Sequence, residues 1–184
     1  MLFRSRLSSD NSITKGSVIV LATTFTLISS VTVGAGGASS IDFTSIPATY
    51  TDLQVVLSGR TTYSGGGTAL CWMTFNSSGG TAYSTKKLQG DGSASLTAST
   101  SSAAQFVIGY IPGTTYTTNT FNNYQIYIPN YAGSNNKSVS VDSVTENNAT
   151  LSYANLYAGL WSNTAAITSI SLAPESGKIG RAHV

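Results

Sequence analysis

The stretch that decides the fold is Ser138-Val-Ser-Val-Asp-Ser-Val144, which opens with valines and polar residues in strict alternation. A period of two places successive side chains on opposite faces of a β-strand, whereas a helical face repeats every three to four residues. The stretch therefore predicts a strand with one face toward a core and the other toward solvent.

Short apolar runs stand on both sides of this strand, and each is bounded by Gly, Pro or Asn. The predicted strands cover residues 41–46, 53–58, 70–75, 105–111, 121–128, 151–161 and 166–172. Evenly punctuated short strands without a helix of normal length are typical of a sandwich or barrel, not of alternating β and α units. We therefore predict an all-β fold, a jelly-roll-like antiparallel two-sheet sandwich of about nine or ten strands.

The composition agrees with this fold class. The chain has 184 residues, of which 41% are hydrophobic, enough for the core of one domain. Charged residues make up only 9%, against roughly 25% in an average globular chain. Ser and Thr together account for 54 residues, so hydroxyl groups replace charges on the surface.

The same counts exclude most catalytic and metal sites. The single cysteine, Cys71, excludes a disulfide framework and a multi-cysteine zinc site, and the single histidine, His183, excludes paired histidine ligands. Asp142 and Glu146 are the only closely spaced carboxylates, and their place at a strand end favours surface decoration over a glycosidase pair. We expect no enzymatic activity, no cofactor and no metal.

Both ends of the chain back-translate to one oligonucleotide and its reverse complement, and they resemble the adapter of short-read sequencing libraries. We therefore predict adapter-derived residues at 1–5 and 178–184, an N-terminal extension or linker at 6–23 and the sandwich domain at 24–177. Without the ends, six cations remain against seven acids, so we expect no nucleic-acid binding, which needs a clustered basic face. These cations are Arg6, Lys15, Arg60, Lys86, Lys87 and Lys137.

Several segments carry local predictions. Residues 17–33 are free of charge but rich in β-branched residues, Ser and Thr, which favours a strand over a membrane span. Residues 93–104 have low complexity and predict an exposed, mobile loop. The glycines at 65–67 predict a hairpin tip, and Lys86-Lys87 predicts a solvated sheet edge. We assign Trp72 and Trp161 to the core.

Three tyrosines are candidate surface-contact residues, because flat side chains bind sugar rings and partner surfaces. Tyr63, Tyr116 and Tyr131 adjoin loops rich in Gly, Thr or Asn, and we expect them to be exposed.

Residues 25–53 resemble a module of uncharacterised β-sandwich virion proteins of tailed phages of marine bacteria. The resemblance continues through Thr74-Phe-Asn76, Tyr83-Ser84, Leu88-Gln-Gly90 and residues 126–132, 137–141 and 159–170. It spans about residues 24–172 and carries no catalytic motif. The resemblance implies a tail or other structural protein of the virion, and it implies a missing last strand, since such proteins continue into one more.

Two functions are expected from these observations. The first is a non-enzymatic virion structural protein, tail-associated or contacting a host receptor or glycan, with other virion proteins as partners and a homo-oligomer, for example a trimer, as its form. The alternative is a carbohydrate-binding or adhesin domain of a secreted bacterial protein, since a fold alone does not separate the two. The expected location is the virion, or the extracellular space in the alternative.

Overall fold

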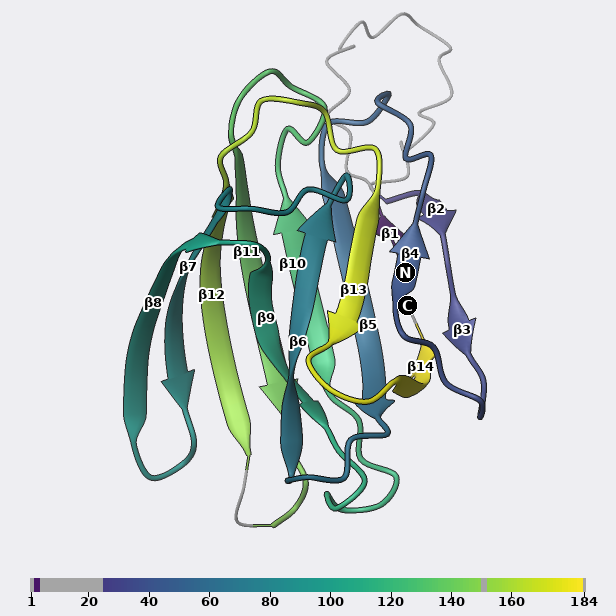
Figure 1. Ribbon diagram of the computed structural model, residues 1–184, viewed down its shortest axis with the longest axis vertical. Helices are drawn as coiled ribbons and strands as arrows, with labels where there is room; N and C mark the ends of the chain where they lie inside the picture. Colours follow the sequence, from purple (N-terminus) through teal and green to yellow (C-terminus); the bar gives the residue numbers. More distant parts are fainter. Residues whose placement is uncertain (1, 4–24, 150–151, 184) are drawn as a thin grey trace, which may run out of the picture.

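The computed structural model describes residues 2–3, 25–149 and 152–183, which form strands and turns but no helix. Two antiparallel sheets pack face to face, so the predicted all-β sandwich is confirmed (Figure 1). The described residues form fourteen strands. The excess over the expected count comes from β1, β8 and β14, which were not predicted as strands, and from the predicted strand at 17–33, which contains two short strands, β2 and β3.

The larger sheet contains six long strands side by side. In spatial order they are β5 (Leu53–Thr61), β10 (Asn123–Ile128), β11 (Lys137–Thr145), β12 (Tyr153–Trp161), β7 (Tyr83–Gly90) and β8 (Ser95–Ala103). Shorter strands extend the sheet on the β5 side: β1 (Leu2–Phe3), β2 (Leu27–Ser29), β3 (Thr32–Val33) and β14 (Ile179–His183).

The smaller sheet has the order β4 (Ile41–Phe43), β13 (Ile170–Pro174), β6 (Thr68–Phe75) and β9 (Phe106–Pro112). The chain crosses from one sheet to the other between β3 and β4, β4 and β5, β5 and β6, β6 and β7, β8 and β9, β9 and β10, β12 and β13, and β13 and β14. This repeated crossing is the jelly-roll-like feature, and the meander β10-β11-β12 interrupts it.

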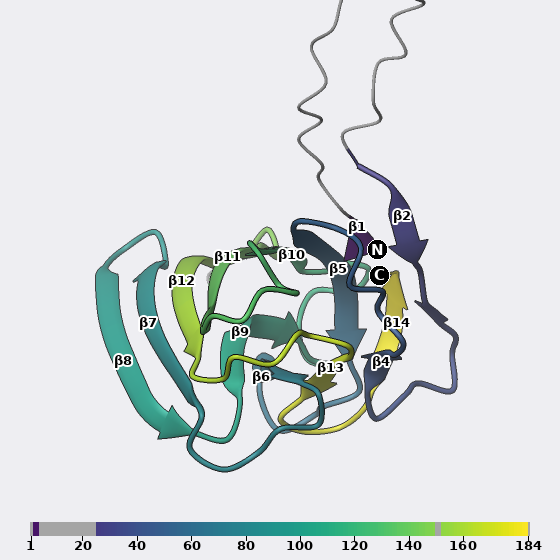
Figure 2. The same cartoon turned by 90° about the horizontal axis from the view of Figure 1, so that it is seen from above.

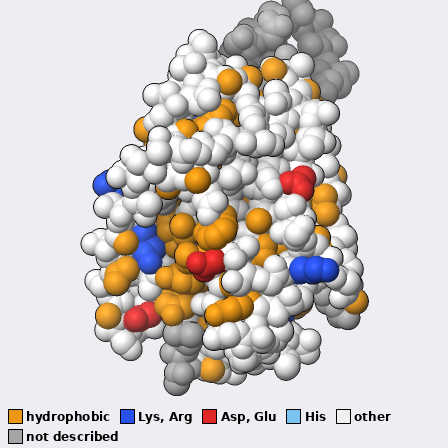
Figure 3. Space-filling model, viewed as in Figure 1, with side chains coloured by type: hydrophobic (Ala, Val, Ile, Leu, Met, Phe, Trp, Pro, Cys, Tyr) orange, Lys and Arg blue, Asp and Glu red, His pale blue; other side chains and the backbone are white. Residues whose placement is uncertain are grey.

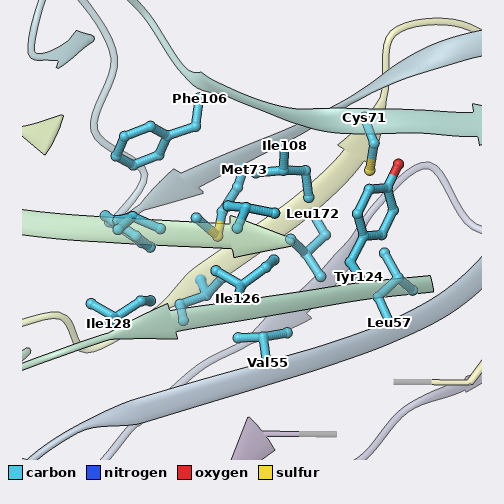
Figure 4. Close-up of a cluster of buried hydrophobic side chains, with 14 of the residues drawn as sticks. Val55, Leu57, Cys71, Met73, Phe106, Ile108, Tyr124, Ile126, Ile128 and Leu172 are labelled. Carbon is cyan, nitrogen blue, oxygen red and sulfur yellow. The ribbon is translucent and has the colours of Figure 1, made fainter. Parts of the chain in front are cut away.

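The core lies between the sheets and follows the two-residue period of the sequence. In β11 every second side chain is buried, from Lys137 to Thr145, as the alternation predicts. Figure 4 shows the aliphatic part of this core, in which Ile126, Met73 and Leu172 converge from both sheets. An aromatic cluster adjoins it, with ring centroids 4.7 Å apart for Tyr83 and Phe106.

Four local predictions are wrong. Residues 93–104 are largely exposed as predicted, but they are not a loop, because β8 is a strand that pairs with β7 along most of its length. Lys86 and Lys87 do not mark a sheet edge, since β7 lies between β12 and β8. The glycines at 65–67 lie on a crossover between the sheets instead of a hairpin. Trp161 is buried as predicted, whereas Trp72 is only half-buried, on the outer face of the smaller sheet.

The segments near both ends of the chain pair with β5. β1 and β14 are both antiparallel to it, and β14 also pairs with β3. The adapter origin of these residues stays a prediction, because strand pairing does not report the source of a sequence. Of the predicted strand at 17–33, residues 17–24 lie outside the described residues, and the rest contains β2 and β3.

The two sheets differ in width. β9 is the edge of the smaller sheet, and β7 and β8 extend past it (Figures 1 and 2). The inner face of β8 is therefore uncovered, and its residues 95–102 are all exposed. This overhang creates an open side of the sandwich.

Candidate functional site

A cleft of about 200 Å3 opens where the overhanging strands β7 and β8 face the edge strand β9. Its floor comes from two cross-strand rows on the inner face of the larger sheet, because paired residues of antiparallel strands point to the same side. One row is Tyr157, Lys87 and Ala98, and the next contains Thr85 and Thr100. The remaining lining residues are Leu70, Val107 and Tyr110. We call this feature the β8–β9 cleft.

Apolar side chains surround the cleft on the side of the smaller sheet. Figure 3 shows hydrophobic side chains gathered over the lower parts of β6 and β9, with a Lys or Arg side chain beside them toward β7 and an Asp or Glu side chain among them. Leu70 belongs to β6, and Val107 belongs to β9. The cleft therefore combines an apolar wall with a floor that carries hydroxyl groups and one cation.

Lys87 supplies that cation. Its Nζ donates hydrogen bonds to Gln89 Oε1 at 2.9 Å and to the Tyr110 hydroxyl at 3.4 Å, and it lies 5.5 Å from the centroid of the Tyr110 ring. An ammonium group has three donors, and these bonds use two of them. Within the described part of the chain, Lys87 forms no ion pair with a carboxylate, and its two hydrogen bonds go to neutral groups.

Tyr157 has a buried hydroxyl group without a partner. The side chain is only 4% exposed, and the hydroxyl makes no hydrogen bond to any described residue. Burial raises the pKa of Tyr157, and the neighbouring Tyr110 raises it further, so the group stays protonated. A buried polar group left without a hydrogen bond costs about 1–3 kcal/mol, so Tyr157 is a donor in need of an acceptor.

Tyr110 is held in place from several sides. Its ring stacks on that of Tyr153, with centroids 4.5 Å apart. Its carbonyl oxygen accepts hydrogen bonds from Thr145 Oγ1 at 2.9 Å and from Asn122 Nδ2 at 3.3 Å. Gly109, with φ of 143°, sits at a β-bulge just before it. Tyr110 is therefore held in the wall of the cleft by contacts within the protein itself.

Unpartnered polar groups continue inward from the cleft. Gln89, Asn155 and Ser143 form a cross-strand row over β7, β12 and β11. Asn155 is buried, and neither its amide nitrogen nor its amide oxygen has a hydrogen-bond partner among the described residues; the same holds for the Ser143 hydroxyl. Such groups are normally satisfied by a protein partner, by ordered water or by a ligand.

The three tyrosines chosen from the sequence do not form this site. Exposure was wrongly predicted for Tyr131 and Tyr116, which are buried, and Tyr63 is half-buried. The Tyr131 hydroxyl donates to the carbonyl oxygen of Pro47, because the loops at that end fold back onto the sandwich. The backbone nitrogen of Thr114 donates to the carbonyl oxygen of Tyr63, and that of Tyr116 donates to the carbonyl oxygen of Gly113, so these two tyrosines adjoin the same loop.

Sequence reasoning missed Lys87, Tyr110 and Tyr157 as site residues. The sequence contains one signal for Lys87. In a strand every second side chain points to the same face, so Lys87 lies on the face of the apolar Tyr83, and the structure shows that this is the inner face. Lys86, the adjacent residue, is exposed on the outer face. The second lysine of the pair is therefore the one that enters the cleft.

Two other described cations stabilise loops. Arg60 donates to the carbonyl oxygens of Thr117 and Thr120 at 2.6 Å each, Gly113 at 2.7 Å and Tyr116 at 3.3 Å. These bonds occupy the terminal nitrogens of its guanidinium group, beside a hollow of about 430 Å3. Arg60 therefore closes the 113–120 loop and does not offer those nitrogens to a ligand.

Lys137 has the same kind of role as Arg60. It is buried, and its Nζ donates to the carbonyl oxygens of Gly133, at 2.6 Å, and Asn135. Burial lowers the pKa of Lys137. The side chain thereby ties down the turn that precedes β11.

The close carboxylate pair lies outside the cleft. Asp142 is exposed on the outer face of β11, and Glu146 is exposed just beyond the end of that strand. Glu146 Oε1 accepts hydrogen bonds from the backbone nitrogens of Asn148 and Asn147, which lower its pKa. A lowered pKa suits a turn-stabilising carboxylate and opposes the role of a general acid.

The outer face of the larger sheet is a second notable surface. Leu156 and Leu88 lie opposite each other on β12 and β7 and are 56% and 51% exposed. Leu160 and Val144 are exposed on the same face. Asp142 and Lys86 are the charged side chains on this face of β11, β12 and β7. We call this surface the outer apolar face.

Within the described residues, no three Asp, Glu, His or Cys side chains come together as metal ligands, and no helix is long and apolar enough to cross a membrane. No protein-family model, curated protein or solved structure matches the chain. The resemblance to phage virion proteins therefore stays a prediction.

Proposed function

We propose that this chain is a non-enzymatic structural module of a phage virion, associated with the tail or with contact to the host surface. The resemblance of residues 24–172 to virion proteins supports the proposal, as does the low charge of the hydroxyl-rich surface. The observation that carries it is the outer apolar face, because virion proteins assemble through surfaces that become buried on association.

The outer apolar face fits association with other copies of the chain. Its exposed leucines and valine lie among small residues such as Ala158 and Ser140, whose short side chains do not hold a partner surface away from them. Burial of apolar surface stabilises association by about 25 cal/mol per Å2 before the cost of lost motion. Contiguous exposed apolar patches on soluble proteins mark interaction sites. We therefore propose a homo-oligomer.

Light scattering coupled to size-exclusion chromatography tests the assembly. We expect the full chain to form an oligomer of defined mass and Leu156→Asp to shift it toward the monomer. Leu96→Asp is the matched control, because Leu96 is 49% exposed but lies on the inner face of the overhang. A chain that stays monomeric over the whole concentration range contradicts the assembly role.

The gene neighbourhood tests the virion location. We expect long-read sequencing of the source DNA to place the uncut gene beside capsid, portal or tail genes.

The β8–β9 cleft favours the second candidate, a carbohydrate-binding or adhesin domain of a secreted bacterial protein, because it offers a preformed polar and apolar site. A gene that encodes a secreted bacterial protein would replace the virion proposal with this candidate.

A further inference from the structure

We propose that the β8–β9 cleft binds a carboxylate-bearing saccharide unit, with the Lys87 ammonium facing the carboxylate. The inference rests on the glycan-contacting part of the proposed function and adds to it a site and a ligand class. Its basis is the set of charges, donors and apolar surfaces that line the cleft.

The charge in the cleft favours an anionic ligand. The Lys87 ammonium has one donor left after its bonds to Gln89 and Tyr110, and no described carboxylate pairs with it. Hydrogen bonds between an ammonium and a carboxylate are shorter and stronger than those between neutral groups. A ligand carboxylate would therefore both neutralise Lys87 and use its remaining donor.

The hydroxyl groups favour a ligand with several oxygen atoms. The Tyr157 hydroxyl is buried beside the cleft and lacks an acceptor, and the side chains of Thr85 and Thr100 lie in the next row of the floor. Each of these hydroxyls can both donate and accept. A sugar presents ring and hydroxyl oxygens at close spacing, so one unit can reach more than one of them.

The volume of the cleft and its apolar wall favour a ligand that places one sugar ring in the cleft. A volume of about 200 Å3 suits a single six-membered ring with its substituents. Leu70, Val107 and Ala98 offer apolar contact to the C–H face of such a ring. The Tyr110 ring stacks on Tyr153 on one side and has Lys87 Nζ near it, so it contributes its hydroxyl more than a free stacking face. Recognition therefore depends on charge and hydrogen bonds.

Calorimetric titration of the full chain tests the proposal. The probes are oligosaccharides of galacturonate, glucuronate and sialic acid, each compared with its methyl ester, which removes the charge and keeps the shape. We expect at least one acid to bind, its ester to bind at least about tenfold more weakly, and added salt to weaken the binding.

Three variants locate the binding site. We expect Lys87→Met, which keeps the length of the side chain, to weaken binding at least about tenfold. Tyr157→Phe removes only the unpartnered hydroxyl and should weaken binding several-fold without unfolding the chain. Lys86→Met is the matched control, because Lys86 is exposed on the opposite face of the same strand. Thermal unfolding of each variant checks that it is folded.

The proposal is overturned if none of the acids binds at millimolar concentration, if esters bind as well as acids, or if Lys87→Met keeps the affinity of the parent chain. These outcomes are separate from the test of the virion role. A gene beside tail genes with no binding removes only the cleft inference, whereas binding by a secreted bacterial protein removes only the virion role.

Discussion

The hydroxyl groups of two buried tyrosines differ in what they contribute to stability. The Tyr83 hydroxyl accepts a hydrogen bond from the Phe75 backbone nitrogen at 2.9 Å and lies 3.3 Å from the carbonyl oxygens of Phe75 and Ser78. The Tyr157 hydroxyl has no partner among the described residues. We expect Tyr83→Phe to lower the free energy of unfolding by about 1–2 kcal/mol, because it leaves the Phe75 N–H unpaired.

Tyr157→Phe should be neutral or stabilising by up to about 1 kcal/mol, since it removes an unsatisfied buried group. Urea unfolding of both variants and of the parent chain measures the difference. A loss of stability in Tyr157→Phe equal to that in Tyr83→Phe would mean that the Tyr157 hydroxyl is hydrogen-bonded in solution, for example to ordered water.

The thiol of Cys71 is the second residue-scale feature with a measurable consequence. Cys71 is fully buried and faces the Tyr124 hydroxyl (Figure 4), and burial raises the pKa of the thiol to about 12. Because the thiolate is the reactive form, we expect no modification of the native chain by a disulfide reagent at pH 8. Modification should occur only in chains that have unfolded, and denatured chain serves as the control. Rapid labelling of the native chain contradicts the described burial.

At the scale of elements, glycine decides how closely the two sheets approach. A Cβ at Gly159 of β12 would lie 2.5 Å from Cε1 of the buried Phe106 on β9. A Cβ at Gly90 of β7 would meet nothing within 4 Å. We expect Gly159→Ala to destabilise the fold by about 1–3 kcal/mol through overpacking, and Gly90→Ala to change stability by less than about 0.5 kcal/mol.

Denaturant unfolding curves of the two glycine variants provide the measurement. Equal stabilities of the two variants would show that the Phe106 ring moves aside without cost. We do not expect this, because the ring is packed among other aromatic side chains and its centroid lies 5.4 Å from that of Phe75.

The strands of the larger sheet should also differ in local stability. β11 is flanked by β10 and β12 on its two sides and buries every second side chain, whereas β8 is an edge strand with exposed residues. Local opening is easiest where few buried contacts must break. We expect amide hydrogen exchange to be slowest in β11 and fastest in β8 among the long strands. Strong protection of β8 in a monomeric sample contradicts this order.

The elements also show what the sequence can and cannot predict. β11 follows from the alternation at Val139 and Val141, and its burial period continues through Ser143 and Thr145, which leaves Val144 exposed. β8 contains Ser, Thr and Ala with a single Leu, so its strand state comes from pairing with β7 and leaves no periodic signal in the sequence. The cleft was not predictable, since it depends on the different widths of two sheets. The predicted exposure of Tyr116 and Tyr131 was wrong because loops also cover the ends of a sandwich and bury the side chains beneath them.

At the scale of the whole molecule, the low charge matters as much as the fold. Of the described cations, Arg60 and Lys137 bind backbone carbonyl oxygens, and Lys87 lies in the cleft. Few charged side chains are left to repel another copy from the outer apolar face. A hydroxyl-rich sandwich of this kind is therefore suited to packing into an assembly while keeping one open polar site.

Alkaline pH should destabilise the whole fold, because the molecule buries acidic groups in their protonated forms. Burial raises the pKa of Cys71 and Tyr116 to about 12 and also raises those of Tyr124 and Tyr131. The unfolded chain loses these protons near pH 8.5 for Cys and pH 10 for Tyr. Above those values the folded state binds more protons than the unfolded state, so the free energy of unfolding falls as pH rises.

We expect the stability contributed by these groups to be fully present below about pH 8 and to be lost progressively as pH rises toward the folded-state values, with a total loss of at least about 2 kcal/mol by pH 11. Urea unfolding at pH 7, 9, 10 and 11 at constant ionic strength measures the loss. Cys71→Ala separates the thiol from the tyrosines, because it should remove the part of the decline that begins near pH 8.5 and leave the part that begins near pH 10. A free energy of unfolding that stays constant up to pH 11 contradicts the buried, protonated state of these side chains.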